Sequence, residues 1–144
     1  MDYQVIMVIG LPASGKSTYI KHLQNYLLCD DFITTFFNGE VLKKISEGHK
    51  VCLSDPRLCM MRVFEDVIRK IKPYTPTIKL ILFENNPEKC IINSRTRNDK
   101  RDGQKMEQCI LNYSKVYLLE NYKNYDNDIE TIQEKIEKKR FEAS

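Results

Sequence analysis

The sequence VIMVIGLPASGKST at residues 5–18 joins a nearly continuous apolar run to a glycine-rich loop. An apolar run that ends in glycine is typical of a strand buried on both faces of a parallel sheet. After Lys16, Ile20 and Leu23 recur at helical spacing. The order strand, loop, helix therefore predicts that the loop lies at the carboxyl end of a buried strand.

The loop fully satisfies the phosphate-binding pattern G-x-x-x-x-G-K-[ST], called the P-loop. Its glycines let the backbone wrap closely enough for N–H groups to point at phosphate oxygens, and the helix start adds partial positive charge. Lys16 is expected to reach the outer phosphates and Ser17 to place its hydroxyl at Mg²⁺, so the pattern predicts ATP and Mg²⁺ as the bound groups. The residues expected to contact the nucleotide are Gly10, Leu11, Pro12, Ala13, Ser14, Gly15, Lys16, Ser17 and Thr18.

Further short apolar runs at residues 26–29, 51–53 and 78–83 alternate with segments of helical periodicity. This alternation is typical of βαβ units and predicts an α/β, three-layer P-loop kinase fold. We expect a central parallel sheet of four or five strands with helices on both faces, in one domain over residues 1–144. Residues 121–127 are compatible with a loop or a fifth, edge strand, and the spacing of isoleucines predicts a docked helix over about 128–141.

The composition fits an ordinary soluble domain of 144 residues, with 42% hydrophobic and 30% charged residues. The net charge of +3 permits a phosphate-bearing partner without requiring one. Five cysteines with no C-x-x-C pair favour reduced thiols in the cytoplasm. The first apolar run stops at Gly10, too short for a membrane span, so no membrane association is expected.

Three classes of P-loop protein compete for this sequence. A GTPase switch should contain an Asn-Lys-x-Asp segment, which is absent, and a motor ATPase needs modules that 144 residues do not supply. A small kinase needs a base for the acceptor hydroxyl, an acid near the metal and a cationic lid. The sequence offers a candidate for each.

Asp30 closes the second strand candidate and Asp55 the third, so both are expected at the carboxyl edge, where ligands of open α/β sheets collect. Asp30 is the candidate general base, with a helix cap as the structural alternative. Asp55 is the candidate acid that orients Lys16 or a water on Mg²⁺, with a turn before Pro56 as its alternative.

A basic stretch follows the fourth strand and its helix, where small kinases place a mobile lid over about residues 94–103. Its cations are Arg95, Arg97, Lys100 and Arg101. A correctly placed arginine can accelerate phosphoryl transfer by about 10³–10⁵. Asp99 and Asp102 make a solvated surface turn the structural alternative.

The order of these motifs over roughly residues 3–120 resembles the phage-type polynucleotide 5′-kinase domain, within the broader group of small P-loop kinases. The paired aspartates before Phe32 are similar to that family's Asp-Asp-aromatic segment, and Asp55 to its strand-end aspartate. Arg97 and Arg101 are similar to its Arg-x-x-x-Arg lid. The resemblance implies that Asp30 is the general base, that Arg101 grips the transferred phosphoryl group and that Arg97 supports it.

The sequence departs from that family at residues 32–34, where Phe-Ile-Thr replaces a segment with an arginine that helps hold the acceptor strand. Three functions therefore stay open. The favoured one is an ATP-dependent kinase of a nucleic-acid hydroxyl, the 5′-OH end of a polynucleotide. The others are a kinase of a free nucleoside, nucleotide or modified base, and an ATP-binding module without acceptor chemistry.

Overall fold

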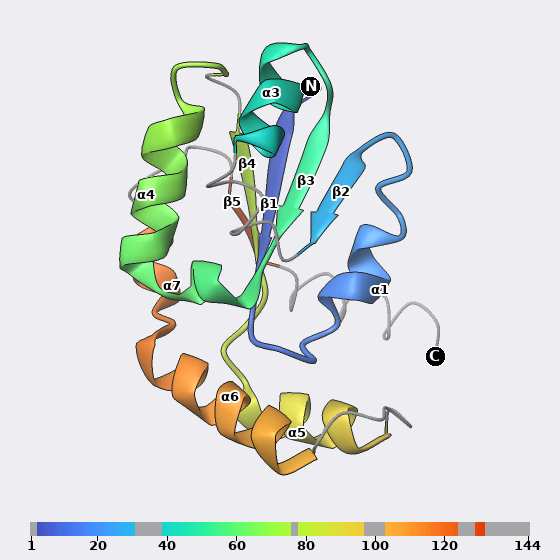
Figure 1. Cartoon of the computed structure of the whole chain (residues 1–144). Coiled ribbons are helices and arrows are strands. Elements are labelled where there is room, and N and C mark those ends of the chain that lie inside the picture. Colours follow the sequence, from blue (N-terminus) through green and yellow to red (C-terminus); the bar gives the residue numbers. More distant parts are fainter. Residues whose placement is uncertain (1–2, 31–38, 76–77, 97–102, 124–128, 132–144) are drawn as a thin grey trace.

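In the computed structural model, five parallel strands form one sheet in the order β2-β3-β1-β4-β5 (Figure 1). The structure describes residues 3–30, 39–75, 78–96, 103–123 and 129–131. The strands are β1 (Val5–Ile9), β2 (Leu27–Asp30), β3 (Val51–Ser54), β4 (Ile78–Leu82) and β5 (Ile129–Thr131). The predicted parallel α/β architecture is confirmed, with five strands.

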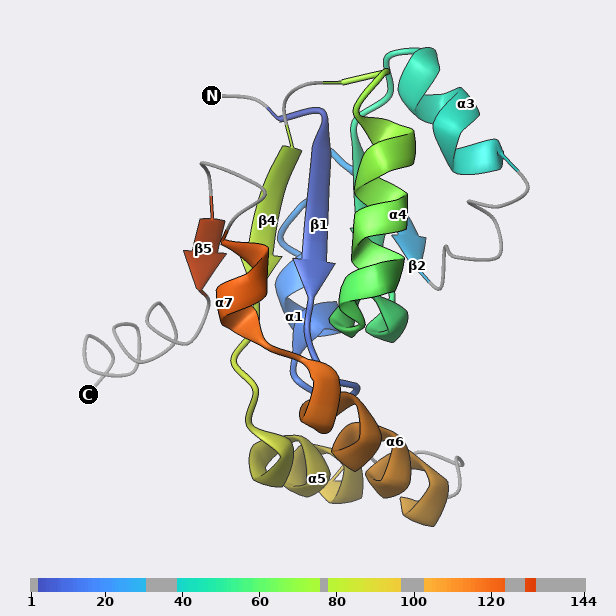
Figure 2. The ribbon, with the colours of Figure 1, turned by 90° about the vertical axis from the view of Figure 1, so that its left-hand side faces the viewer.

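Helices cover both faces of this sheet. They are α1 (Lys16–Ile20), α3 (Glu40–Ser46), the 3₁₀ helix η1 (Pro56–Cys59), α4 (Met61–Ile71), α5 (Pro87–Thr96), α6 (Gly103–Val116) and α7 (Leu119–Tyr122). Helix α1 lies on one face and α4 on the other, while α5 and α6 lie together beyond the ends of the strand arrows (Figures 1 and 2). The carboxyl edge of the sheet therefore faces the pair α5 and α6.

The central strand β1 is buried along its whole length, as the apolar run predicts. Its odd-numbered residues, Val5, Met7 and Ile9, join the hydrophobic cluster beneath α4. Ile6 and Val8 point to the other face and join the cluster beside α1. Because successive side chains of a strand alternate between faces, one short run anchors both layers of helices.

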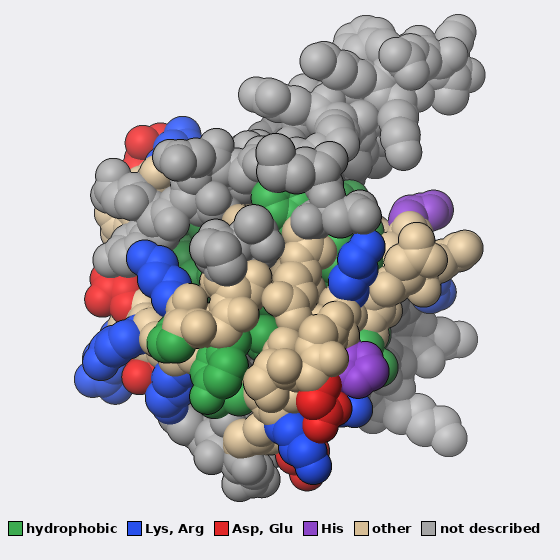
Figure 3. Space-filling model, turned by 90° about the horizontal axis from the view of Figure 1, so that it is seen from above, with side chains coloured by type: hydrophobic (Ala, Val, Ile, Leu, Met, Phe, Trp, Pro, Cys, Tyr) green, Lys and Arg blue, Asp and Glu red, His purple; other side chains and the backbone are tan. Residues whose placement is uncertain are grey.

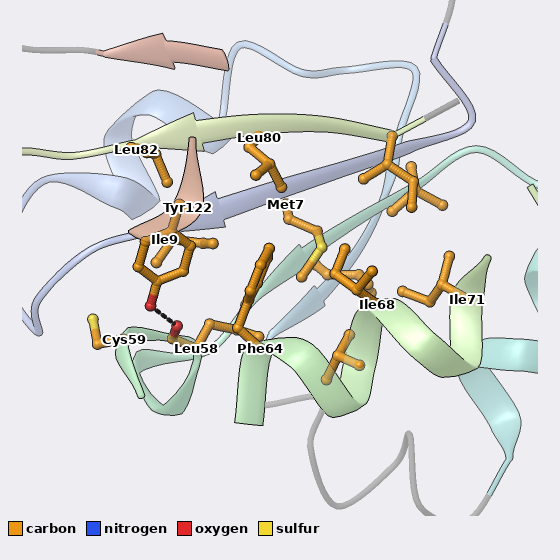
Figure 4. Close-up of a cluster of buried hydrophobic side chains, with 14 of the residues drawn as sticks. Met7, Ile9, Leu58, Cys59, Phe64, Ile68, Ile71, Leu80, Leu82 and Tyr122 are labelled. Atoms are coloured by element: carbon orange, nitrogen blue, oxygen red, sulfur yellow. Dashed lines mark hydrogen bonds between the residues drawn. The ribbon is translucent and has the colours of Figure 1, made fainter. Parts of the chain in front are cut away.

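The larger cluster ties the C-terminal helices to the sheet (Figure 4). Phe64 of α4 stacks against Tyr122 of α7, with ring centroids 4.7 Å apart. The Tyr122 hydroxyl donates to the backbone oxygen of Leu58 in η1. This buried contact places α7, and the end of α6 before it, against the layer that carries α4.

Two helix ends follow from the chemistry of single residues. Asn86 Oδ1 accepts a hydrogen bond of 3.1 Å from the Lys89 N–H, so Asn86 caps α5 and Pro87 occupies the first helical position. Gly48 has a φ of 90° just past α3, the left-handed conformation that ends helices.

The C-terminal prediction is wrong where the structure describes it. Residues 129–131, expected in a helix over about 128–141, form β5, which pairs in parallel with β4 through Leu80 and Ile129. The exposed backbone edge of β4 supplies hydrogen bonds that the isoleucine spacing does not encode. Of residues 121–127, left open between a loop and an edge strand, the structure describes 121–123, and α7 ends there at Tyr122. Residues 124–128 and 132–144 lie outside the described part.

Charges of both signs are interspersed on the edge of the sheet where the strands begin, which Figure 3 views from above. Within the described part of the chain, no helix combines the length and apolar character that crossing a bilayer requires.

Replacing the buried Phe64 by alanine should lower the free energy of unfolding by about 3–5 kcal/mol. The substitution removes the ring contact with Tyr122 and leaves a cavity in the core. Urea unfolding followed by circular dichroism measures the change. Tyr74→Ala is the control, since Tyr74 is 49% exposed and its loss should change the free energy of unfolding by less than about 0.5 kcal/mol. Equal losses in the two variants would contradict this placement of the core.

Candidate active site

The P-loop begins directly after β1 and leads into α1, at the carboxyl edge of the sheet. Ala13 has a φ of 62° and Gly15 a φ of 100°, so the backbone turns through the left-handed region twice within three residues. Such turns gather successive N–H groups into a concave surface that binds anions. The loop conformation therefore matches the phosphate cradle that the sequence predicts.

The base of this loop is closed by Phe83, the residue after β4. A Cβ atom at Gly10 would lie 2.7 Å from the Phe83 Cβ and 2.9 Å from the Ser14 Oγ. The Phe83 N–H donates to the Ile9 backbone oxygen at 2.8 Å, which fixes the backbone of Phe83 beside the loop. Position 10 therefore has room for glycine alone.

Lys16 lies inside the loop and is 8% exposed. Its Nζ donates to the backbone oxygens of Gly10 at 2.6 Å and Leu11 at 2.8 Å. Burial lowers the pKa of the Lys16 ammonium group, an effect that the nearby Cys59, Cys90 and the carboxylates of Asp30 and Asp55 oppose. The ammonium group is thus held within the loop by neutral carbonyl oxygens, ready to exchange them for phosphate oxygens.

The thiol of Cys59 lies beside this ammonium group but supplies little negative charge. Burial raises the pKa of Cys59 to about 12, so the thiol stays protonated near neutral pH. The carboxylates of Asp30 and Asp55 also act to raise the pKa of Lys16.

The Ser14 hydroxyl gives an independent test of whether the loop fits a phosphate. Ser14 Oγ is a buried side-chain atom with no hydrogen-bond partner among the described residues. Buried polar atoms are rarely left without partners, and their exceptions often mark ligand sites. A phosphate oxygen in the loop would supply that partner, so the residues present fit the expected group.

The structure places Asp30 at the same edge of the sheet as the P-loop. Asp30 ends β2 and lies in register with Ser54 of β3, which in turn pairs with Val8 of β1. Its side chain is exposed, and its carboxylate acts electrostatically on Lys16. Asp30, at the end of β2, and Lys16, at the start of α1, therefore lie at the same edge of the sheet.

Asp55 is fully buried and its carboxylate is paired with Arg57, a residue that the sequence reading missed. Arg57 Nε donates to Oδ1 at 2.9 Å and Nη2 to Oδ2 at 2.7 Å, and the Arg57 N–H also donates to Oδ1. Asp55 thereby caps η1. To bind Mg²⁺ directly, the Asp55 carboxylate would have to give up at least one of its hydrogen bonds from Arg57.

The described residues contain no cluster of three or more metal-ligating side chains. The exposed Ser17, at the start of α1, remains the candidate that meets a metal brought with the nucleotide. Its role, like that of Asp55, stays a prediction.

Of the four cations expected in the lid, Arg97, Lys100 and Arg101 fall outside the described residues, between α5 and α6. Arg95, just before them, pairs with Glu107 of α6 through an Nε–Oε1 distance of 2.7 Å. Arg95 therefore lies in α5 and links it to α6 by this ion pair.

Phe83 and Asn93 also take part in the site without having been predicted. Phe83 is the last residue of the apolar run that predicts β4, a signal of position but not of role. Asn93 of α5 donates to the Ala13 backbone oxygen at 3.0 Å, across 80 residues of sequence. A local sequence pattern cannot predict a contact between residues that lie so far apart in the sequence.

Gly10→Ala should weaken ATP binding about 10- to 100-fold, because the new methyl group forces the loop away from Phe83 and small displacements of a site are costly. Titration calorimetry with ATP and Mg²⁺ measures the affinity. Gly103→Ala is the matched control, since no atom of the described residues lies within 4 Å of its Cβ position and alanine favours the helix α6. Unchanged affinity in Gly10→Ala would show that the loop tolerates the displacement.

No family model matches the sequence. Among solved structures, the chain is similar to a gluconokinase from Sinorhizobium meliloti 1021, with a TM-score of 0.53 and 12% identity over 88% of this chain and 80% of that one. This likeness shows that the chain has a P-loop kinase-like fold. Among curated proteins, the sequence is 40% identical over 138 residues to the uncharacterized protein R277 of Acanthamoeba polyphaga mimivirus. The match spans 92% of this chain and 99% of the viral protein, so the chain belongs to the family of that mimivirus protein.

Proposed function

We propose that this protein is an ATP-dependent phosphotransferase that moves the γ-phosphoryl group to a hydroxyl of a nucleic acid, the 5′-OH end of a polynucleotide. The observation that supports the proposal is that Asp30 ends β2 at the edge of the sheet where the P-loop carries Lys16, and that its charge acts to raise the pKa of Lys16. A switch or a bare nucleotide-binding module needs the lysine, whereas a kinase also needs a carboxylate facing it.

The P-loop would hold the β-phosphate by its backbone N–H groups, and Lys16 would bridge the β- and γ-phosphates. In the structure its Nζ is bound to the carbonyl oxygens of Gly10 and Leu11. Phosphate oxygens would replace these neutral acceptors by charged ones, which strengthens the hydrogen bonds and favours the protonated lysine.

Asp30 would accept the proton of the acceptor hydroxyl as its oxygen attacks the γ-phosphorus in line with the departing ADP. The new bond joins the acceptor oxygen to phosphorus, the bond from the γ-phosphorus to the bridging oxygen breaks, and its electron pair leaves with ADP. When bound beside the Ser17 hydroxyl, Mg²⁺ would neutralise charge on the β- and γ-phosphate oxygens. Asp55, held by Arg57, would orient groups near that metal.

Arg97 and Arg101 complete the proposed site from the lid segment. By resemblance to the phage-type kinases, Arg101 would contact the transferred phosphoryl group and Arg97 would support it. The flanking helices α5 and α6 lie beyond the carboxyl edge, on the side of the sheet where the P-loop lies (Figure 1).

A second candidate function is phosphorylation of a small molecule, such as a nucleoside, a nucleotide or a sugar. Two observations favour it: residues 32–34 carry no cation to hold an acceptor strand, and the similar solved structure is a gluconokinase. An ATP-binding module without acceptor chemistry is the third candidate.

Incubation with γ-labelled ATP and a 5′-OH oligonucleotide tests the proposal, with label expected on the oligonucleotide. Parallel reactions contain DNA, RNA, a mononucleotide, a nucleoside and gluconate. Label on the small acceptors alone would replace the nucleic-acid proposal by the second candidate. Binding of ATP with no label on any acceptor would favour the third.

Asp30→Asn should lower the rate of phosphoryl transfer by about 10²–10⁴, the usual contribution of a general base. ATP affinity should stay within about threefold, because Asp30 ends β2 and is not part of the P-loop. Asp66→Asn on α4 is the matched control, since it makes the same chemical change in a surface ion pair with Lys70. Transfer by Asp30→Asn at the wild-type rate would remove Asp30 from the mechanism.

A further inference from the structure

One side chain joins the helix before the lid to the phosphate-binding loop. Asn93 Nδ2 donates to the backbone oxygen of Ala13 at 3.0 Å. Asn93 is half-buried on α5, two turns beyond the cap at Asn86. The contact bridges two elements that the sequence separates by 80 residues.

The hydrogen bond acts on a residue of the loop that has an unusual backbone conformation. Ala13 is the one non-glycine residue with a positive φ in the described part of the chain. A trans peptide unit points its carbonyl and its N–H in opposite directions. The Ala13 carbonyl accepts from Asn93, and the Ser14 N–H on the other side donates to Leu11 at 3.2 Å. The peptide between residues 13 and 14 is therefore held from both sides.

The same contact fixes the end of α5. The helix is capped by Asn86 at its start and ends at Thr96, directly before the basic segment 97–101. Helix α6 is anchored separately, because Asn85 donates to the backbone oxygens of Ser114 and Tyr117. Asn93 thus links the last turns of α5 to the loop by a hydrogen bond.

We propose that Asn93 is a positioning residue for the nucleotide phosphates. Through the Ala13 carbonyl it holds the loop in its phosphate-binding conformation. This inference rests on the proposed function insofar as it assigns ATP to the loop. It differs from a packing role, because a packing role would lower stability and leave the nucleotide affinity of the folded protein unchanged.

Asn93→Asp tests the inference with the smallest change of shape. The carboxylate has no donor for the Ala13 oxygen and repels it, so the affinities for ADP and ATP should fall by about tenfold and by the same factor. The Michaelis constant for the acceptor should stay at the wild-type value. Calorimetric titration with ADP and with ATP measures the affinities, and thermal unfolding without nucleotide measures the stability.

Asn93→Ala is the second variant, which removes the donor without adding charge and should weaken both nucleotides less than Asn93→Asp does. Asn93→Gln restores a donor and should recover part of the affinity. Asn112→Asp on the exposed face of α6 is the matched control, because its oxygen accepts from Gln108 and the aspartate keeps that acceptor.

Wild-type affinity for ADP in both Asn93→Asp and Asn93→Ala would overturn the inference. A loss of affinity that merely follows a loss of folded protein, with no recovery in Asn93→Gln, would also overturn it in favour of packing. A wild-type protein that binds neither ADP nor ATP would instead remove the proposed function, and this inference with it. If the wild-type protein binds ATP and ADP but transfers no phosphoryl group, the proposed reaction is contradicted and the role of Asn93 in nucleotide binding is not.

Discussion

The close approach of Gly10 to Phe83 is the constraint on which the site depends. The central strand β1 is buried on both faces, so its carboxyl end cannot shift, and the loop that follows must turn within the space that Phe83 leaves. Lys16 is enclosed by that turn and bound to the loop's own carbonyl oxygens. A rigid strand and a tight turn together bring a buried cation to the edge of the sheet, which is the property a phosphate ligand recognises.

The strand order β2-β3-β1-β4-β5 brings further polar residues to this edge of the sheet, beside the P-loop. Strands on both sides of β1 end at the same edge, so residues distant in sequence converge there. Asp30 arrives from β2, the Asp55–Arg57 pair follows β3, and Asn93 comes from the helix after β4. The proposed chemistry uses this convergence, because an acceptor base, a phosphate cradle and a lid have to meet around one phosphorus atom.

The sequence alone was sufficient for the features that local patterns encode. The buried strand β1, the loop from Gly10 to Thr18 and the cap at Asn86 each rest on neighbouring residues, and the structure contains all three. The prediction from sequence was wrong at Ile129, because the isoleucine spacing indicated a helix whereas the residue pairs with the edge of β4 in a strand. The partnership of Asp55 with Arg57 and the bond from Asn93 to Ala13 were also missed, since tertiary contacts choose among partners that a local pattern cannot rank.

The central claim is that the buried ammonium group of Lys16 and the amides around it form a site for the phosphates of ATP. Titration calorimetry of ATP with Mg²⁺ into the wild-type protein and into Lys16→Ala tests this claim most directly, with circular dichroism as the check that both chains are folded. The account predicts one ATP bound per wild-type chain and an affinity lower by about 100-fold or more in the folded variant, because charge-assisted hydrogen bonds to the phosphates are lost. Equal affinity in the two folded proteins would contradict it.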